Sequence, residues 1–379
     1  MMNEVNVGTL LDELAGRVDG LADTITGRIR AEVPGYAQLP YAEHRRDVRE
    51  QIKNVVEGVG ARQPPPAAAI EHARAVGRRR AARHVALPDV IEAYHIAYRE
   101  IWDELLTRAK DFHPDLTSAL VGEVALLWSW FHRLSAAVAD AHAEETRVRE
   151  ATQLALRRRF VETLSGTVSN PEEQDSLARS LGFAPDGEFV VAVAAGVPET
   201  RVEQINTSLG ETAGVAHCAY DSGRTVLVAQ RCTHEELLGA VHHGEPSALT
   251  GTGLIRRGLE GAALSLTDAT EALGWALTEG RDVCFSDDWL IVVLSGVRHR
   301  IDELIAPGAA AARRYPHIAQ AVRAFGDSRY SVSASARLLN VHPNSVKYRL
   351  DRWKSLTGWD VHTFSGLASS LVSLELGEI

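Results

Sequence analysis

Polar side chains that can read DNA bases cluster in one short segment, 344–352. Residues four and eight positions apart share a face of an α-helix, because each turn holds about 3.6 residues. In the major groove, asparagine can pair with adenine and arginine with guanine, while serine can reach bases or phosphate. We expect four side chains to form one groove-facing wall: Asn344, Ser345, Tyr348 and Arg352.

Three further basic side chains border this wall: Lys347, Arg349 and Lys354. Contacts from lysine and arginine to the phosphate backbone position a protein on the duplex but do not report its sequence. We therefore expect these three residues to contact phosphates, and the wall between them to contact base edges.

The helix that would carry this wall has clear limits and a clear core face. Val346, Leu350 and Trp353 are spaced to form one apolar stripe opposite the polar wall. His342-Pro343 predicts its start, since proline suits the first helical position, and Gly358 predicts its end.

A second, shorter helix is predicted just before it, over 332–339. Ser331 suits its N-cap, and Ala336 is small where two helices would cross closely. Asn340 tolerates the left-handed conformation that a tight turn requires. Two helices joined in this way predict a helix-turn-helix.

The charge distribution supports the same interpretation. The chain carries a formal net charge of −10, but 329–354 holds six basic residues against one acid, Asp351. A local excess of positive charge is the electrostatic signature of a nucleic-acid interface. The alternative is an ordinary two-helix packing with a solvated charged face. The polar wall favours DNA over that alternative.

The segment 330–376 resembles the C-terminal DNA-binding domain of the PucR/CdaR family of bacterial regulators. The resemblance rests on SARLLNVHPNSVKYRL at 335–350 and on Leu356-Thr357-Gly358. Ser345 stands where the family more often has threonine. The resemblance implies a first helix near 318–325, a last helix over 364–376, and a function in transcription regulation.

Composition limits the remaining possibilities. A chain of 379 residues predicts two or three domains, and 45% hydrophobic with 24% charged residues is typical of a soluble globular protein. The three cysteines have no paired spacing, so neither a disulfide framework nor a metal site is expected.

We see no apolar stretch of the roughly 20 residues that a membrane helix requires. The N-terminus lacks signal-peptide features, and we expect a cytoplasmic protein without membrane contact.

The pattern along the chain predicts a multidomain, mainly α protein. Helical spacing over 1–165 predicts an N-terminal helical bundle for sensing or dimerisation, with a long connecting helix from Pro114 to about Leu164. Short β-branched runs over 166–300 predict a small α/β domain with a mostly antiparallel sheet. The helix-turn-helix domain would occupy 309–379, after an alanine-rich link that follows Pro307.

The family resemblance implies a middle domain similar to the GGDEF fold of diguanylate cyclases, so an enzyme is a rival interpretation. Such cyclases carry two glycines, two acids and a phenylalanine in a central hairpin. Here the hairpin reads Tyr220-Asp221-Ser222-Gly223-Arg224-Thr225, with one acid and no tandem glycine. Two-metal phosphoryl chemistry needs clustered carboxylates. We therefore expect no enzymatic activity and no catalytic residues. A strand is expected near 248–254, and Gly251-Thr252-Gly253 resembles the strand end of that fold and is interpreted as a turn rather than as a phosphate cradle.

The N-terminal bundle more weakly resembles the N-terminal domain of RsbR-type stress proteins, which are related to globins. His95 and His132 are the candidate haem ligands, but a lone helical histidine more often packs or faces solvent. We expect no cofactor and no metal.

These expectations combine into an effector-responsive DNA-binding regulator that reads the major groove with the helix at about 343–356. Its partners would be double-stranded DNA, further copies of the chain in a homodimer or higher homo-oligomer, and a small-molecule effector of unknown identity. The alternative is a partner-switching signalling protein that acts through its N-terminal bundle.

Overall fold

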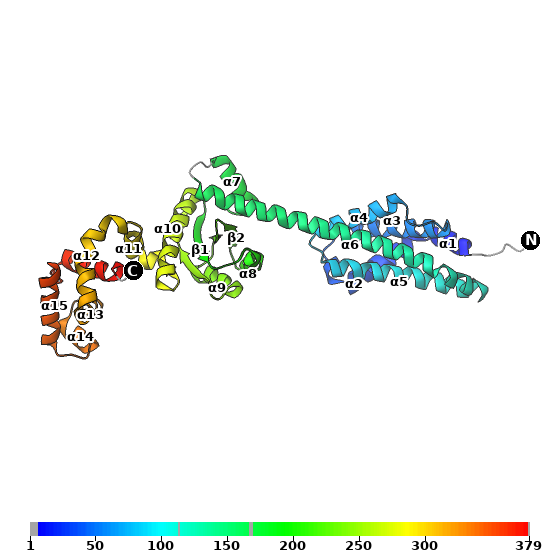
Figure 1. Cartoon of the computed structure of the whole chain (residues 1–379). Coiled ribbons are helices and arrows are strands. Elements are labelled where there is room, and N and C mark those ends of the chain that lie inside the picture. The colour runs from blue at the N-terminus through cyan, green and yellow to red at the C-terminus, as the bar shows by residue number, and fades with distance from the viewer. Residues whose placement is uncertain (1–6, 113, 167–169, 378–379) are drawn as a thin grey trace, which may run out of the picture. The chain divides into compact units, whose positions relative to one another are not determined.

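The computed structural model describes residues 7–112, 114–166 and 170–377, and its contacts divide the chain into two units, Met1–Gln153 and Leu154–Ile379. The first unit is helical throughout its described part, as predicted (Figure 1). Prolines 64–66 separate two of its helices. Its elements are α1 (Val7–Ala15), α2 (Val18–Glu32), η1 (Pro34–Tyr36), α3 (Tyr41–Gly60), α4 (Ala67–Ala82), α5 (Leu87–Phe112) and the first part of α6 (Pro114–Ser165).

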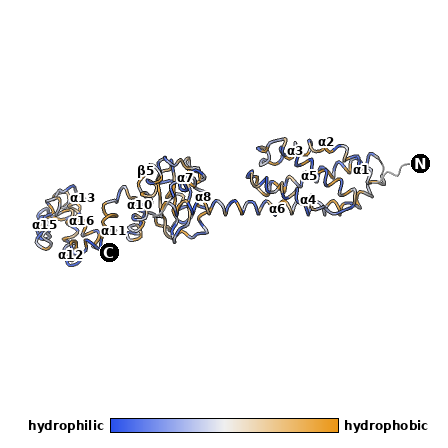
Figure 2. Tube along the Cα trace, turned by 90° about the horizontal axis from the view of Figure 1, so that it is seen from above, coloured by the Kyte–Doolittle hydropathy of each residue, from blue (hydrophilic) through white to orange (hydrophobic). Residues whose placement is uncertain are grey.

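One apolar core holds the N-terminal unit together, with buried residues from α1 through α6. Apolar and polar residues interchange along these helices, as amphipathic helices require (Figure 2). Two glycines allow close approaches between elements. A Cβ on Gly77 of α4 would lie 2.4 Å from the carbonyl oxygen of Val138 in α6, and one on Gly58 would overlap the ring of Trp130. Larger residues at these two positions would force the helices apart.

The long helix predicted from Pro114 to about Leu164 is confirmed as α6, which continues past the limit of the first unit at Gln153. Its last part bears charged side chains, including Arg157, which pairs with Glu203 at 2.9 Å. After α6 the chain forms one more helix and then the first strand of the middle region.

The second unit begins with a small α/β region whose sheet has the order β2-β3-β1-β4-β6, with β5 paired to β1. All pairings are antiparallel except that of β4 with β6, so the predicted mostly antiparallel sheet is confirmed. The strands are β1 (Glu188–Ala195), β2 (Val215–Asp221), β3 (Arg224–Gln230), β4 (Leu249–Thr252), β5 (Arg256–Arg257) and β6 (Val283–Cys284). The helices are α7 (Pro171–Ser180), α8 (Val202–Leu209) after the short η2 (Glu199–Arg201), α9 (His234–Gly244), α10 (Gly258–Glu279) and α11 (Phe285–Gly296).

Helices cover both faces of this sheet, which explains the continuous apolar run of β1. Val191 and Val193 contribute to a core that includes α10, whereas Val190, Ala192 and Ala194 contribute to a core that includes α8 and α9. Alternate residues of a strand point to opposite faces, so a strand buried on both sides has no polar alternation.

The strand expected near 248–254 is confirmed as β4, which includes Gly251 and Thr252, so only the interpretation of these two residues as part of a turn is wrong. A Cβ on Gly251 would lie 2.1 Å from the backbone nitrogen of Leu273, and one on Gly253 would lie 2.0 Å from the carbonyl oxygen of Ser265. These glycines let α10 pack directly on β4, inside the sheet. Glycine inside a strand often marks such a close backbone approach.

The predicted link after Pro307 is also wrong, because α12 (Arg298–Arg314) runs through this proline without interruption. An interior proline costs a helix about 3 kcal/mol or more. Here the alanines that follow favour the helix, and Ala309 and Ala311 are buried. The hydroxyl of Ser373 also donates to the carbonyl of Ile305 at 2.8 Å. Tertiary packing therefore stabilises a helix that local rules would end.

The C-terminal part of the second unit is helical and has its own apolar core. Besides α12 it contains α13 (Pro316–Asp327), α14 (Val332–Leu338), α15 (Pro343–Thr357) and α16 (Phe364–Leu376). The helices expected at 318–325 and 364–376 are thus confirmed. Among the described residues, no helix is both long and apolar enough to cross a membrane.

Candidate DNA-binding site

The first helix and the turn of the predicted helix-turn-helix form as expected. Ser331 caps α14 through its side chain, which accepts from the backbone N–H of Ala334 at 3.3 Å. Ala336 is buried, and its carbonyl accepts from the N–H of Val341 at 2.9 Å, which closes the turn. Asn340 has a φ of 51°, in the left-handed region. Asparagine adopts this conformation more readily than other residues with side chains.

The second helix, α15, starts and ends at the predicted signals. His342 is its N-cap: Nδ1 accepts from the backbone N–H of Asn344 at 3.2 Å, and Pro343 follows at the first helical position. At the other end Gly358 has a φ of 80° and donates to the carbonyl of Lys354 at 2.8 Å. Together these caps fix the length of the helix that carries the polar wall.

The buried face of α15 fixes its rotation about its own axis. Val346, Leu350 and Trp353 are at most 2% exposed, as the apolar stripe predicts. The indole N–H of Trp353 donates to the hydroxyl of Ser370 at 2.8 Å, and that hydroxyl donates to the carbonyl of Gly366 at 2.6 Å. A rotation of α15 would bury polar residues and break these bonds, so the opposite wall is held toward solvent.

The structure brings all four predicted base-reading residues onto that exposed wall. Asn344, Ser345, Tyr348 and Arg352 are exposed, and Tyr348 is 69% exposed. Within the part of the chain that the structure describes, none of these four side chains forms a hydrogen bond or ion pair. An unpartnered polar wall on a helix whose other face is fixed is suited to a polar ligand surface.

The three residues predicted to contact phosphate have different surroundings. Lys347 is exposed and Arg349 is half-buried. Lys354 pairs with Asp360 at 2.7 Å, and the carboxylate raises the pKa of the lysine. A phosphate contact by Lys354 would have to replace that carboxylate, so Lys347 and Arg349 are better placed for the backbone of a duplex.

One further basic residue, Arg337, is exposed at the end of α14. From the sequence, only the positive charge of this residue could be recognised. The direction in which its side chain faces depends on how the seven-residue helix α14 packs. It adds to the positive surface beside α15.

The other candidate sites have less support. The His95 side chain is 53% exposed on α5, with its ring centroid 5.2 Å from that of Phe131, and His132 is exposed on α6, so neither is buried in the core of the bundle. The hairpin of the α/β region turns at Ser222 and Gly223, with φ values of 49° and 85°, as expected for a tight turn. Across the described residues, no group of three or more histidine, cysteine and acidic side chains could hold a metal ion.

Comparison with known domains agrees with this organisation. The chain matches three family models: the RsbT co-antagonist protein RsbRD N-terminal domain over residues 19–157, the GGDEF-like domain over 165–274, and the PucR C-terminal helix-turn-helix domain over 318–376. These matches confirm the predicted resemblances and the mainly α fold with a small α/β region in the middle.

No curated protein matches the chain. One similar solved structure is a regulator of polyketide synthase expression from Bifidobacterium adolescentis, at 23% identity and a TM-score of 0.33, over 59% of this chain and 98% of that one. A TM-score this low supports no inference.

The PucR-type domain, at the position of the exposed wall of α15, indicates a DNA-binding transcription regulator. With an RsbRD-type N-terminal domain, a GGDEF-like middle domain and a PucR-type helix-turn-helix, the chain has the domain architecture of a PucR/CdaR-type regulator.

Proposed function

We propose that this protein is an effector-responsive regulator that binds DNA as a dimer and inserts α15 into the major groove. The observation that carries the proposal is the wall of α15, where exposed polar side chains lie opposite a buried apolar stripe and have no partner among the described residues. In this proposal Asn344, Ser345, Tyr348 and Arg352 contact base edges. Lys347, Arg349 and, after release from Asp360, Lys354 contact phosphates.

Dimerisation follows from the small size of the reading surface. One recognition helix contacts only a few base pairs, and regulators of this kind commonly reach specificity by binding two symmetric half-sites. In this proposal the effector changes the spacing or orientation of the two recognition helices. Unchanged half-site spacing, footprint and affinity with every effector that binds would contradict this coupling.

The first test is fluorescence anisotropy of the full chain on its own promoter region across a salt series, with Arg352→Ala as the variant. We expect selective binding that weakens steeply with salt, because phosphate contacts release counterions. Removal of the arginine should cost about 1–3 kcal/mol of discrimination between the cognate and a scrambled site.

The matched control is Arg313→Ala, which removes the same charge from an exposed position on α12. A second comparison is Lys347→Ala, which should weaken binding to all sequences. The slope of log affinity against log salt concentration should become less steep by about 1. Equal losses of discrimination in Arg352→Ala and Arg313→Ala would show that α15 does not read bases.

We further propose that the α/β region has no cyclase activity and serves dimerisation or sensing. Its hairpin offers one carboxylate, Asp221, whose oxygen accepts from the neighbouring Ser222 hydroxyl at 3.3 Å. Domain limits of 1–165, 166–300 and 309–379 are part of the same proposal, with the correction that α12 crosses residue 309.

A second candidate is a partner-switching protein, which is favoured by the match of residues 19–157 to the RsbT co-antagonist domain. In that case the N-terminal unit would bind a signalling protein and DNA binding would be secondary. Co-purification of a stoichiometric protein partner, together with no selective DNA binding at any salt concentration, would favour this candidate.

A further inference from the structure

A small cavity lies inside the N-terminal unit, between α2, α3, α4 and α5. Its volume is about 40 Å³. The walls are largely apolar, with Ile29, Ile52, Val76 and Ile101 among them. At roughly 10–15 Å³ for each water-sized position, the cavity has room for about three such positions. It can therefore hold a group of only a few heavy atoms.

Arg80 of α4 lines this cavity, and its side chain is almost completely buried, at 2% exposed. Its Nη2 donates to Oδ2 of Asp47 at 2.9 Å, while the other oxygen of Asp47 accepts from Arg79 at 2.7 Å. Among the residues that the structure describes, the remaining nitrogens of Arg80, Nε and Nη1, have no hydrogen-bond partner, although Nη1 lies 3.8 Å from Oε1 of Glu43. Buried donors without a partner are costly, and more so on a charged group. The arginine therefore has donor capacity that the protein itself does not use.

Three other side chains of the cavity also have a buried polar atom without a partner: Nδ1 of His44, Nε2 of Gln51 and the hydroxyl oxygen of Tyr98. Burial, with Arg80 and Arg30 nearby, lowers the pKa of His44 to about 3, so its ring is neutral at physiological pH. The unused atoms on Arg80 and Gln51 are donors only, whereas those of His44 and Tyr98 can donate or accept. The unused polar atoms of the cavity thus include more donors than acceptors, and the cationic donor, Arg80, lies beside the carboxylates of Asp47 and Glu43. A ligand that accepts hydrogen bonds would satisfy these donors.

We propose that this cavity binds a short-chain carboxylate, whose oxygens accept hydrogen bonds from Arg80 and Gln51 and whose alkyl group packs against the apolar walls. Hydrogen bonds between guanidinium and carboxylate are charge-assisted and stronger than neutral ones. The volume restricts the ligand to about the size of acetate or propionate. Water alone could satisfy some of the donors, but would leave the apolar walls without a matching group.

The position of the cavity gives such a ligand a route to the rest of the chain. Arg80 is three residues after Gly77, the position at which α4 packs closely on the backbone of Val138 in α6. His142 of α6 also donates from Nε2 to the carbonyl of Val85, just after α4, at 2.8 Å. A ligand that shifts α4 would therefore act directly on α6, which continues to Ser165. On this basis, and resting on the proposed regulatory function, the carboxylate is the effector.

The experiment uses the full chain and two readouts. The first is ligand-observed NMR titration with acetate and propionate. Hexanoate, which should be too large, and methylammonium, which has the wrong charge, are the control probes. We expect saturable binding of the two short carboxylates only. Arg80→Lys keeps the positive charge beside Asp47 but loses the planar guanidinium and its parallel N–H donors, and should weaken binding of the carboxylate at least tenfold.

The matched control is Arg78→Lys, on the same helix, where the arginine is 46% exposed and pairs with Glu71. This variant should bind like the unchanged protein. If Arg80→Lys does not fold, Tyr98→Phe replaces it: it removes one unpartnered hydroxyl, keeps the ring, and should weaken binding about two- to tenfold. Tyr41→Phe, at an exposed tyrosine, is its control and should leave binding unchanged.

The second readout is the affinity for promoter DNA with and without saturating propionate. No saturable binding of either short carboxylate, or equal binding by the unchanged protein and by Arg80→Lys and Tyr98→Phe, would overturn the site and show that the cavity holds water only. Carboxylate binding with unchanged DNA affinity would overturn its assignment as the effector. Carboxylate binding by a protein that never selects DNA would support the site and refute the proposed regulatory function.

Discussion

Replacing Trp353 with alanine is expected to unfold the helix-turn-helix and abolish selective DNA binding. The side chain is completely buried between α15 and its neighbours, and its indole N–H bonds Ser370. Truncation of a buried tryptophan leaves a cavity and typically costs about 3–5 kcal/mol, which is a large part of the stability of a small domain. The loss should appear as a lower denaturant midpoint, measured by circular dichroism, and as loss of selective binding in the anisotropy assay.

Two variants separate stability from recognition. Trp353→Phe retains most of the packing and loses the hydrogen bond, so its destabilisation should be clearly smaller. Tyr348→Ala changes an aromatic residue of the same helix that is 69% exposed, and should leave the midpoint unchanged while weakening binding to DNA. A Trp353→Ala protein with an unchanged midpoint would contradict the assignment of this residue to the core.

Replacing Asp47 with alanine is expected to destabilise the N-terminal unit by a similar amount, about 3–5 kcal/mol, because it breaks a buried ion pair from one side. Asp47 is 5% exposed and accepts from both Arg79 and Arg80. Its removal leaves the guanidinium of Arg80 buried, with Glu43 at 3.8 Å as the remaining acid. Chemical denaturation followed by tryptophan fluorescence measures the effect, since Trp130 lies in the same core.

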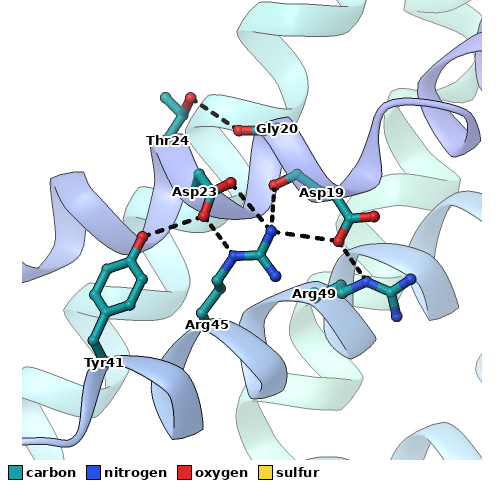
Figure 3. A network of polar contacts seen from close by, with 7 residues as sticks. All are labelled: Asp19, Gly20, Asp23, Thr24, Tyr41, Arg45 and Arg49. Atoms are coloured by element: carbon teal, nitrogen blue, oxygen red, sulfur yellow. Dashed lines mark hydrogen bonds and ion pairs between the residues drawn. The ribbon is translucent and has the colours of Figure 1, made fainter.

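The matched control is Asp19→Ala in the surface network of the same unit (Figure 3). Asp19 also accepts from two arginines, Arg45 and Arg49, but its side chain is 63% exposed. Water can replace these partners, and exposed ion pairs contribute little to stability. We expect only a small change in the denaturation midpoint. Equal losses in the two variants would show that burial is not what makes the Asp47 pair important.

Local signals in the sequence determine the helix-turn-helix and most of its proposed surface. Pro343 and Gly358 mark the ends of α15, and the spacing of its apolar residues marks its buried face. These signals act within one or two helical turns, so no distant contact is needed to interpret them. The strand at Glu188–Ala195 was likewise predictable, because its length and β-branched residues exclude most alternatives.

Elements stabilised from a distance could not be predicted in this way. Pro307 predicts a break in the helix, yet α12 continues because it packs on α16, whose Ser373 donates a hydrogen bond to the Ile305 carbonyl. Gly251 lies in the strand expected near 248–254, but the close approach of Leu273 of α10 to its backbone could not be predicted. In both cases the deciding contact comes from residues more than 20 positions away, which a local pattern does not contain.

Three consecutive arginines at the end of α4 show most clearly which features are local and which depend on tertiary packing. In the sequence, Arg78-Arg79-Arg80 is a run of three identical charges, which local reasoning interprets as a solvated helix face. The first two side chains are 46% and 38% exposed, while the third is 2% exposed and bonds Asp47, 33 residues earlier. The sequence alone determines that α4 is a helix and that its end is basic. Only the tertiary structure decides which of the three arginines is buried, because that depends on which face of α4 packs against α3 and α5.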